Sequence, residues 1–255
     1  MQTRPAAQHM GSGPLLVSGQ GIYEESSTQR FILGTRLQVG ERVFRYAVTN
    51  GAQTAGIIAQ APTLGGATTT LQTTQAVTVA APIGATDVYV NALTTAQAAE
   101  LFADGWASIF DASATACFLY LVRKNTALAT SGTTSYITLY DELHIALTTS
   151  DQVSLITNPY KDVVAVSSAT TLTGAPMGVP PVAITDNYYF WLQTWGPCAI
   201  LPSAALDFDE YVTMSDTNAG YVEADAASAN TMSIGRVLHI GTASEASIVY
   251  LMLAP

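Results

Sequence analysis

The sequence predicts an all-β protein: a β-sandwich or barrel body with a small C-terminal β-barrel, an extended N-terminal arm and one short helix. Two observations predict the β class. Apolar and polar residues alternate with a period of two in short runs such as 75–82 and 86–93, which is the pattern of a half-buried strand. Segments rich in Gly, Asn, Asp and Pro separate these runs at the short spacing of an all-β fold.

The strands are expected one after another along most of the chain. The first begins at Val43–Tyr46, where β-branched and aromatic residues mark out no helical face. Further strands are expected at 75–82, 86–93, 106–111, 116–124, 135–143, 152–157, 162–168, 188–195, 198–203, 210–216, 232–241 and 247–253. Residues 94–105 break this pattern, because Ala-rich helix formers follow Thr residues able to cap, and Gly105 stands where a helix would end. We expect one short helix there.

A segment rich in proline and glycine, residues 173–184, is the best candidate for a domain boundary. It holds three prolines and two glycines, and a proline cannot donate a backbone hydrogen bond to a sheet. The predicted organisation is therefore an N-terminal arm at 1–45, a β-rich body at 46–180 and a small C-terminal β-barrel at 181–255.

The chain carries few charged side chains. Only 11% of its 255 residues are Asp, Glu, Lys or Arg, whereas about 25% is usual. Thr, Ser, Ala and Gly take their place, and the hydrophobic content is 49%. No apolar run approaches the roughly 20 residues that a membrane helix needs. A surface of uncharged polar side chains is typical of extracellular β-proteins and of parts of large assemblies.

Positive charge is concentrated near the N-terminus of an otherwise acidic chain. The net charge is −10, and five of the nine basic residues fall in the first 45 positions: Arg4, Arg30, Arg36, Arg42 and Arg45. The acidic body is a poor partner for free nucleic acid, because phosphate binding needs clustered Lys and Arg. The arm has little apolar content, so we expect it to become ordered against a partner whose carboxylates the arginines contact. An arm threaded into its own barrel would have the same sequence.

Residues that usually carry catalysis or bind metals are sparse. His9, His144 and His239 are single histidines without the spacing of metal ligands, and no Cys-x-x-Cys motif occurs. Cys117 and Cys198 lie far apart within apolar runs. Because a free cysteine behaves as a small hydrophobic residue, we expect both to be buried free thiols.

One cluster of carboxylates could bind an ion. Asp207, Asp209 and Glu210 alternate in a way that can bind Ca²⁺, but the Gly and terminal Glu of a helix–loop–helix calcium site are missing. A polar turn explains the three residues equally well. No nucleophile elbow, phosphate loop or dinucleotide fingerprint occurs. The sequence therefore predicts no enzyme, no cofactor and no metal site.

The segment with most aromatic residues is 187–203, NYYFWLQTWGPCAILPS. In a strand, Trp191 and Trp195 share one face, while Phe190 and Leu192 lie on the other. A carbohydrate-binding platform would expose aromatic rings on one face only. A strand buried on both faces, in the core or against another subunit, explains the pattern more simply.

Several short motifs resemble those of a group of tailed-bacteriophage virion proteins, especially from marine phages. The motifs are Phe44–Ala47, the turn Asn158–Tyr160, Gly178-Val179, and Trp191 with Gln193, Gly196 and Pro197. Residues 234–253 are similar to the last hairpin of the small β-barrel of phage head decoration (cement) proteins. The likeness covers most residues from about 30 to 255, and residues 46–180 form an additional β-region before that barrel.

The resemblance implies a structural virion protein on the capsid exterior, which decorates and stabilises a bacteriophage capsid by binding its lattice. The implied partner is the major capsid protein, and the implied assembly is a homotrimer. No cofactor, membrane or direct nucleic-acid contact is implied. The residues expected at interfaces are Arg30, Arg36, Arg42, Arg45, Trp191 and Trp195.

Three other function classes stay open at this point. A capsid-fibre or tail-fibre recognition module would bind host surface glycans through exposed aromatic residues. A secreted β-rich hydrolase would act through residues distant in sequence. A major capsid protein is the third class, although the common capsid fold of tailed phages needs a long spine helix that the sequence does not predict.

Overall fold

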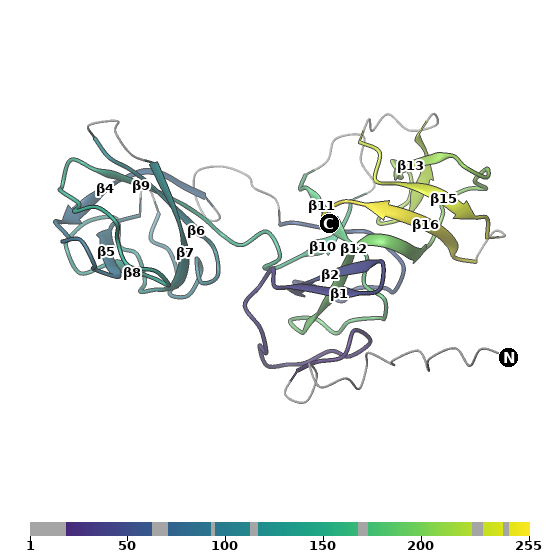
Figure 1. The fold of residues 1–255 in the computed structure, drawn as a ribbon, viewed down its shortest axis with the longest axis horizontal. Coiled ribbons are helices and arrows are strands. Elements are labelled where there is room, and N and C mark those ends of the chain that lie inside the picture. The colour runs from purple at the N-terminus through teal and green to yellow at the C-terminus, as the bar shows by residue number, and fades with distance from the viewer. Residues whose placement is uncertain are drawn as a thin grey trace, which may run out of the picture. The chain divides into compact units, whose positions relative to one another are not determined.

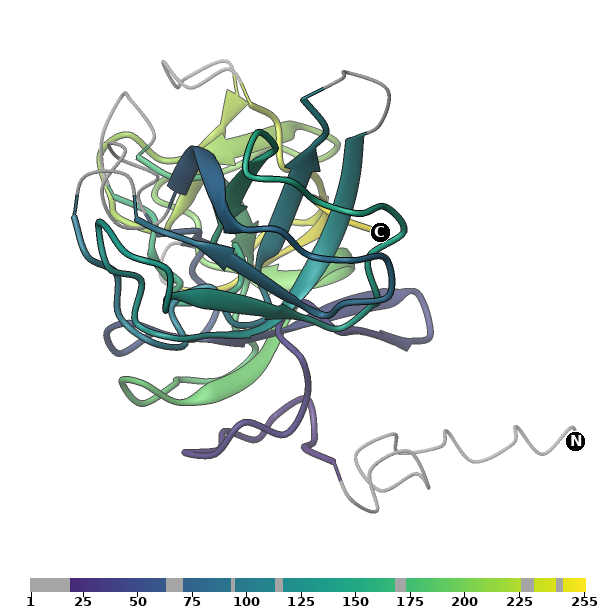
Figure 2. The same ribbon diagram turned by 90° about the vertical axis from the view of Figure 1, so that its left-hand side faces the viewer.

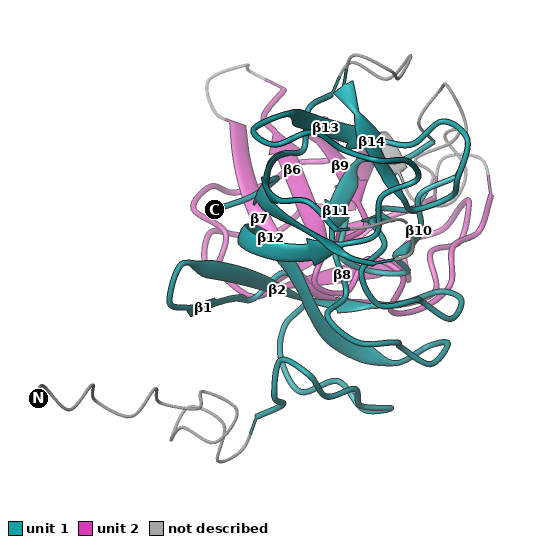
Figure 3. Ribbon diagram, turned by 90° about the vertical axis from the view of Figure 1, so that its right-hand side faces the viewer, with its two compact units in different colours: residues 1–63, 159–255 teal, residues 64–158 magenta. Residues whose placement is uncertain are grey.

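The computed structural model describes residues 19–62, 71–92, 95–112, 117–167, 173–225, 232–241 and 245–255. All elements within these ranges are β-strands (Figure 1), so the predicted all-β class is confirmed. The chain forms two compact units (Figure 3): unit 1 comprises residues 1–63 and 159–255, and unit 2 comprises residues 64–158. The boundary predicted at 173–184 instead lies inside unit 1.

Unit 2 is a closed antiparallel barrel, whose strands lie toward the viewer in Figure 2. In barrel order its described strands are β4 (Leu71–Val79), β5 (Asp87–Val90), β8 (Tyr136–Leu139), β7 (Cys117–Asn125), β6 (Trp106–Phe110) and β9 (Gln152–Ile156). Pairing of β4 with β9 closes the barrel, from Leu71 opposite Ile156 to Ala76 opposite Gln152. The closed barrel therefore lies within residues 46–180, where the sequence predicted a β-sandwich or barrel body, and not in the segment 181–255.

Alternating side chains fill the barrel. Ala107 and Ile109 of β6 are buried in the barrel core, while Trp106 and Phe110 on the same strand point outward. This is the period-two pattern from which the strand was predicted.

The helix predicted at 94–105 is absent from the part of that segment that the structure describes. The backbone N–H of Gln97 donates to the carbonyl of Leu128, and the backbone N–H of Leu128 donates to the carbonyl of Gln97. Glu100 and Asp104 have φ angles of 61° and 60°, in the left-handed region that a right-handed helix excludes. Hydrogen bonds to a neighbouring segment thus outweigh the helix propensity of the alanines.

Unit 1 is built on an antiparallel sheet whose described strands number seven. Their order is β1 (Arg36–Val39), β2 (Arg42–Val48), β12 (Tyr189–Ile200), β16 (Ser247–Met252), β15 (Gly235–His239), β13 (Tyr211–Met214) and β14 (Val222–Ala224). A smaller sheet has the order β10 (Val164–Ala165), β3 (Ala59–Gln60) and β11 (Pro176–Gly178). The C-terminal strands therefore join the N-terminal hairpin β1–β2 in one sheet and do not form the predicted separate barrel.

Strand β12 continues through Gly196-Pro197, where the sequence pattern separated two strands. Its register with β2 shifts between Gln193 and Trp195, and the rest of the strand pairs with β16. Gly196 has a φ of 83°, and a Cβ there would lie 2.5 Å from the carbonyl oxygen of Glu41. Glycine thus lets β12 bend closely past the β1–β2 turn and change its partner strand.

Both faces of β12 are buried, as expected from its sequence. On one face, Trp191 is 2% exposed and packs with Tyr46 of β2 and with Ile22 and Leu33 of the N-terminal segment. The opposite face, which carries Phe190, packs in a separate cluster with residues of the small sheet. Strand β12 is therefore the centre of unit 1.

The described part of the predicted arm is folded into unit 1. Residues 19–35 cover β2 and β12, and residues 36–45 form β1, the following turn and the start of β2. The prediction that the arm becomes ordered only against a partner is therefore wrong for residues 19–45. Arg4 and His9 lie outside the described residues.

Loss of the Trp191 side chain should destabilise unit 1 strongly. We expect Trp191→Ala to lower the free energy of unfolding by about 3–5 kcal/mol, because it leaves a cavity among buried rings. Urea denaturation followed by circular dichroism measures the change. Phe208→Ala is the control: its side chain is 70% exposed in the same unit, so the loss should stay below about 1 kcal/mol. Equal losses would contradict the assignment of Trp191 to the core.

Candidate functional site: an arginine-bearing hairpin beside a pocket

Gln20 fastens the N-terminal segment to β12. Its amide Nε2 donates to the carbonyls of Tyr189 at 2.6 Å and Glu24 at 2.7 Å. Its Oε1 accepts from the Tyr46 hydroxyl at 2.8 Å, and its backbone carbonyl accepts from Trp191 Nε1 at 2.7 Å. One residue therefore satisfies the polar groups of both buried aromatic side chains, which would otherwise be costly to bury.

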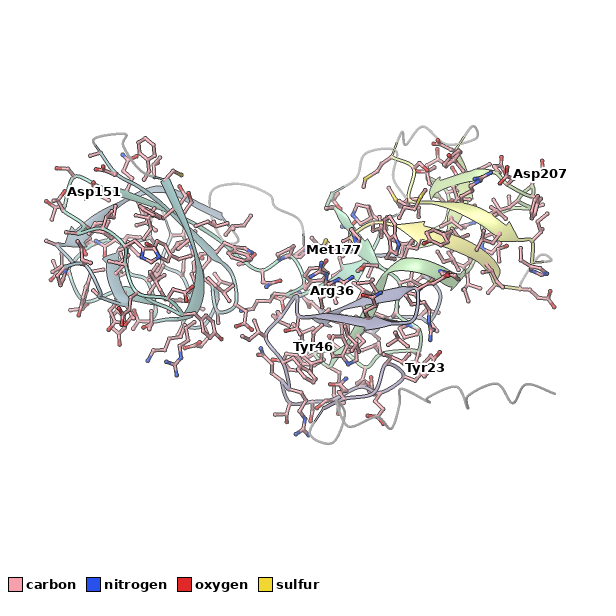
Figure 4. The ribbon with its side chains drawn as sticks, in the orientation of Figure 1. Tyr23, Arg36, Tyr46, Asp151, Met177 and Asp207 are labelled. Atoms are coloured by element: carbon pink, nitrogen blue, oxygen red, sulfur yellow. The ribbon has the colours of Figure 1, made fainter. Side chains whose placement is uncertain are left out.

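The rings around Trp191 form a packed cluster. The ring centroids of Tyr46 and Trp191 lie 5.0 Å apart. The centroid of the Phe31 ring lies 5.2 Å from that of Tyr46 and 5.2 Å from that of Trp191. Burial raises the pKa of Tyr46 to about 12. This arrangement makes the cluster part of the core and leaves Trp191 unavailable to an external ligand (Figure 4 labels Tyr46).

The hairpin β1–β2 carries three of the arginines singled out in the sequence. Strand β1 is an outer strand of the described seven-stranded sheet. Arg36 on β1 lies directly opposite Arg45 on β2, and Arg42 lies opposite Val39 (Figure 4 labels Arg36). Two like charges directly opposite each other destabilise a pair of strands, so an anion beside them would relieve the repulsion.

The contacts of these arginines leave many of their donors unused. Arg36 donates to the side chain of Gln38 at 3.2 Å. The Arg45 guanidinium donates to the carbonyls of Gly34 at 3.3 Å and Pro255 at 3.0 Å, while its Nε is buried with no hydrogen-bond partner. Neither arginine forms an ion pair with a carboxylate of the described residues.

Arg42 borders a pocket in unit 1. Its Nη1 donates to the Tyr23 hydroxyl at 3.3 Å, and its Cζ lies 5.4 Å from the centre of the Phe44 ring. The pocket has a volume of about 240 Å³ and is lined by Tyr23, Arg42, Pro181, Gln193, Pro197 and Leu201, among others. Pockets for small ligands usually measure roughly 300–1,000 Å³. This one is therefore of a size to receive a single side chain of a partner.

The remaining interface candidates lie close to the hairpin in the chain or the sheet. Trp195 is half-buried on β12 opposite Val43, and its ring meets that of Tyr250 with centroids 6.0 Å apart. Arg30 lies in the N-terminal segment, where its backbone N–H donates to the Tyr46 hydroxyl at 3.1 Å. Of the predicted set, only Trp191 is inaccessible.

The carboxylates at 207–210 form a polar turn. Asp209 pairs with Arg236, and Glu210 accepts a hydrogen bond from the backbone N–H of Asp207 at 3.0 Å (Figure 4 labels Asp207). In the part of the chain that the structure describes, no group of three or more His, Cys, Asp or Glu could hold a metal ion. The sequence left an ion-binding site and a polar turn as alternatives for these residues, and the contacts support the polar turn.

The histidines and cysteines do not converge on a site. His144 and His239 are exposed on different units. Both described cysteines are free; Cys198 is buried as expected, and burial raises the pKa of its thiol to about 12. Cys117 is exposed on the outside of the barrel, so its predicted burial is wrong. The alternation of β7 was visible in the sequence, but not which face the barrel encloses.

Gln20 and the pocket could not be identified from the sequence. A single glutamine in a polar segment carries no pattern, and the pocket residues come from distant segments.

No helix among the described residues is long and apolar enough to cross a membrane. Comparisons with known protein families, with curated proteins and with solved structures find no significant match to this chain.

Tyr46 should make unit 1 less stable at high pH. Its folded-state pKa is about 12 against an ordinary value of 10.0, so the unfolded chain loses its proton first as pH rises. The free energy of unfolding therefore falls between pH 10 and pH 12. Tyr46→Phe should show a smaller fall, measured by urea denaturation across this range. Tyr23→Phe, which removes an exposed hydroxyl, is the matched control. A fall unaltered by Tyr46→Phe would contradict the burial of the Tyr46 hydroxyl.

Proposed function

We propose that this protein is a structural virion protein that decorates the exterior of a bacteriophage capsid, with the major capsid protein as its partner. The observation that carries the proposal is the arginine-bearing hairpin. Its three arginines stand on the outer two strands at one side of a sheet, Arg36 and Arg45 on one face and Arg42 on the other. None has a side-chain carboxylate partner among the described residues, in a chain whose net charge is −10. Such a hairpin suits a partner that presents carboxylates.

The hairpin would bind through charge-assisted hydrogen bonds. Arg36 and Arg42 are accessible enough to donate to carboxylates on the capsid lattice, and such bonds are about twice as strong as neutral ones. The pocket beside Arg42 would receive one side chain of the lattice protein. Elsewhere, a surface with few charges avoids leaving unpaired charges buried at contacts, each of which costs several kcal/mol.

Copies of the chain would associate on the capsid, as the homotrimer implied by the resemblance requires. Burial of Trp191 weighs against the glycan-recognition alternative, because this ring cannot stack on a sugar.

The test needs point substitutions because removal of the N-terminal segment would damage unit 1. Deleting residues 1–40 would take away Gln20, Ile22, Leu33 and strand β1. Such a truncated chain would fail to bind for reasons unrelated to the arginines.

We expect the double variant Arg36→Glu, Arg42→Glu to bind undecorated capsids at least roughly tenfold more weakly than the wild type, a loss of about 1.4 kcal/mol. Co-sedimentation with capsids at low and high salt measures it, and the wild type should lose affinity as salt rises. The matched control is Arg236→Glu, an exposed arginine of unit 1 whose pair with Asp209 contributes little.

The proposal would be overturned by a double variant that keeps its thermal midpoint and binds capsids as the wild type does. It would equally be overturned by wild-type protein that does not sediment with capsids at low salt. Circular dichroism of each variant checks that the fold is retained.

A further inference from the structure

The outside of the barrel in unit 2 carries a surface of exposed apolar side chains. We name the outward-facing residues of Trp106–Phe110, Cys117–Leu121 and Gln152–Ile156 the barrel face. The exposed fractions are 37% for Trp106, 45% for Phe110 and 65% for Leu119. These are large apolar groups left in water by the fold of unit 2.

Strand register makes these side chains neighbours. Trp106 lies opposite Leu121 on one side and Ile156 on the other. Two residues further along β6, Ser108 lies opposite Leu119, and Phe110 then lies opposite Cys117. Because residues opposite each other share one side of a sheet, the apolar groups form a continuous surface.

The barrel face contains no charged residue. Its other members are Ser108, Ser154 and Gln152. Contiguous apolar patches on soluble proteins mark contact sites, and the centres of such contacts are depleted in charge. The barrel is closed, so a partner cannot extend it by adding a strand and must bind through these side chains.

Opposite charges stand at the two ends of the barrel face. Beyond Leu121, strand β7 continues into Arg123 and Lys124, both exposed. At the other end, Asp111 directly follows Phe110. Arg123 and Lys124 are the basic residues of unit 2, whose sequence contains no other Lys or Arg. Asp104 also lies near Arg123, but its carboxylate is buried and accepts a hydrogen bond from the Tyr140 hydroxyl. The exposed charges at this end are therefore basic, and the half-buried Asp111 makes the other end acidic.

This distribution of charge selects a second copy of the chain as the partner. Two copies, each with a net charge of −10, repel each other unless they meet where carboxylates are few. If the two faces meet with their strands antiparallel, the basic end of one lies over the acidic end of the other. A two-fold arrangement of this kind is self-complementary.

We propose that the barrel face binds the barrel face of a second copy of this chain, with the strands antiparallel. The apolar side chains form the centre of the contact. Arg123 and Lys124 of each copy then approach Asp111 of the other copy.

The size of the face indicates a weak and reversible contact. Three strands span roughly 10 Å between the outer two, and five residues span about 13 Å along a strand. A stable interface usually buries about 800 Å² on each partner. The contact should therefore be concentration-dependent in solution and strengthen when copies are held side by side, as copies of neighbouring trimers would be under the proposed function.

Sedimentation velocity of the full chain over a range of concentrations, without capsids, tests the proposal. We expect the wild type to self-associate reversibly and Leu119→Glu to associate at least roughly tenfold more weakly, because it buries a charge at the centre. Ile83→Glu is the matched control: Ile83 is 67% exposed in the same unit but lies off the barrel face, so its substitution should change nothing.

A charge exchange tests the antiparallel arrangement. Arg123→Glu should weaken association, and Arg123→Glu combined with Asp111→Arg should restore it. Circular dichroism of all variants checks folding.

Two results would overturn the proposal: a wild type that is monomeric at every concentration, or association unaffected by Leu119→Glu. If the wild type is monomeric and the Leu119→Glu variant unfolds at lower temperature, the face packs within its own chain. Binding of a neutral oligosaccharide by a monomeric wild type, lost in Trp106→Ala, would make the face a sugar platform instead. Because no capsid is present, failure here leaves the capsid proposal untouched, and failure to bind capsids leaves this result untouched.

Discussion

Unit 1 depends on the burial of one strand on both of its faces. Strand β12 has no charged residue in Tyr189–Ile200 and carries large apolar groups on both sides, so each side must be covered. The N-terminal segment covers one side, and the small sheet covers the other. The indole N–H of Trp191 would be costly to bury alone, and the carbonyl of Gln20 accepts its hydrogen bond. The position of residues 19–35 follows from this requirement.

The same strand connects the two halves of unit 1. Its first half pairs with β2 and its second half with β16, and the change occurs where Gly196 permits a close approach to the β1–β2 turn. The arginines of that hairpin stand beside the buried aromatic cluster of unit 1. A binding surface supported in this way needs little ordering when a partner arrives.

Period-two alternation was sufficient to predict the all-β class and strands such as β5 and β6, and apolar residues on both faces predicted the double-sided burial of residues 188–195. It did not predict the short strands β1, β3, β11 and β14. Strand pairing could not be predicted, because the barrel closes through β4 and β9, which are far apart in the chain. Local composition gave a wrong prediction at 94–105. The alanines there favour a helix, but the backbone of Gln97 pairs with that of Leu128. The polar N-terminal segment reads as an arm, yet its few apolar residues are those that Trp191 requires. The sequence showed that the arginines of the candidate site are clustered along the chain. That three of them lie on one hairpin could be seen only from the strand register.

A charge-poor chain makes its remaining charges informative. Three arginines share the hairpin of unit 1, and the basic residues of unit 2 stand at one end of an uncharged face. Both features suit a protein that meets neighbours over much of its surface. Capsid decoration can be tested by quantitative mass spectrometry of purified virions, with the major capsid protein as reference. We expect a copy number comparable to that of the major capsid protein; a few copies per particle, or none, would contradict capsid decoration.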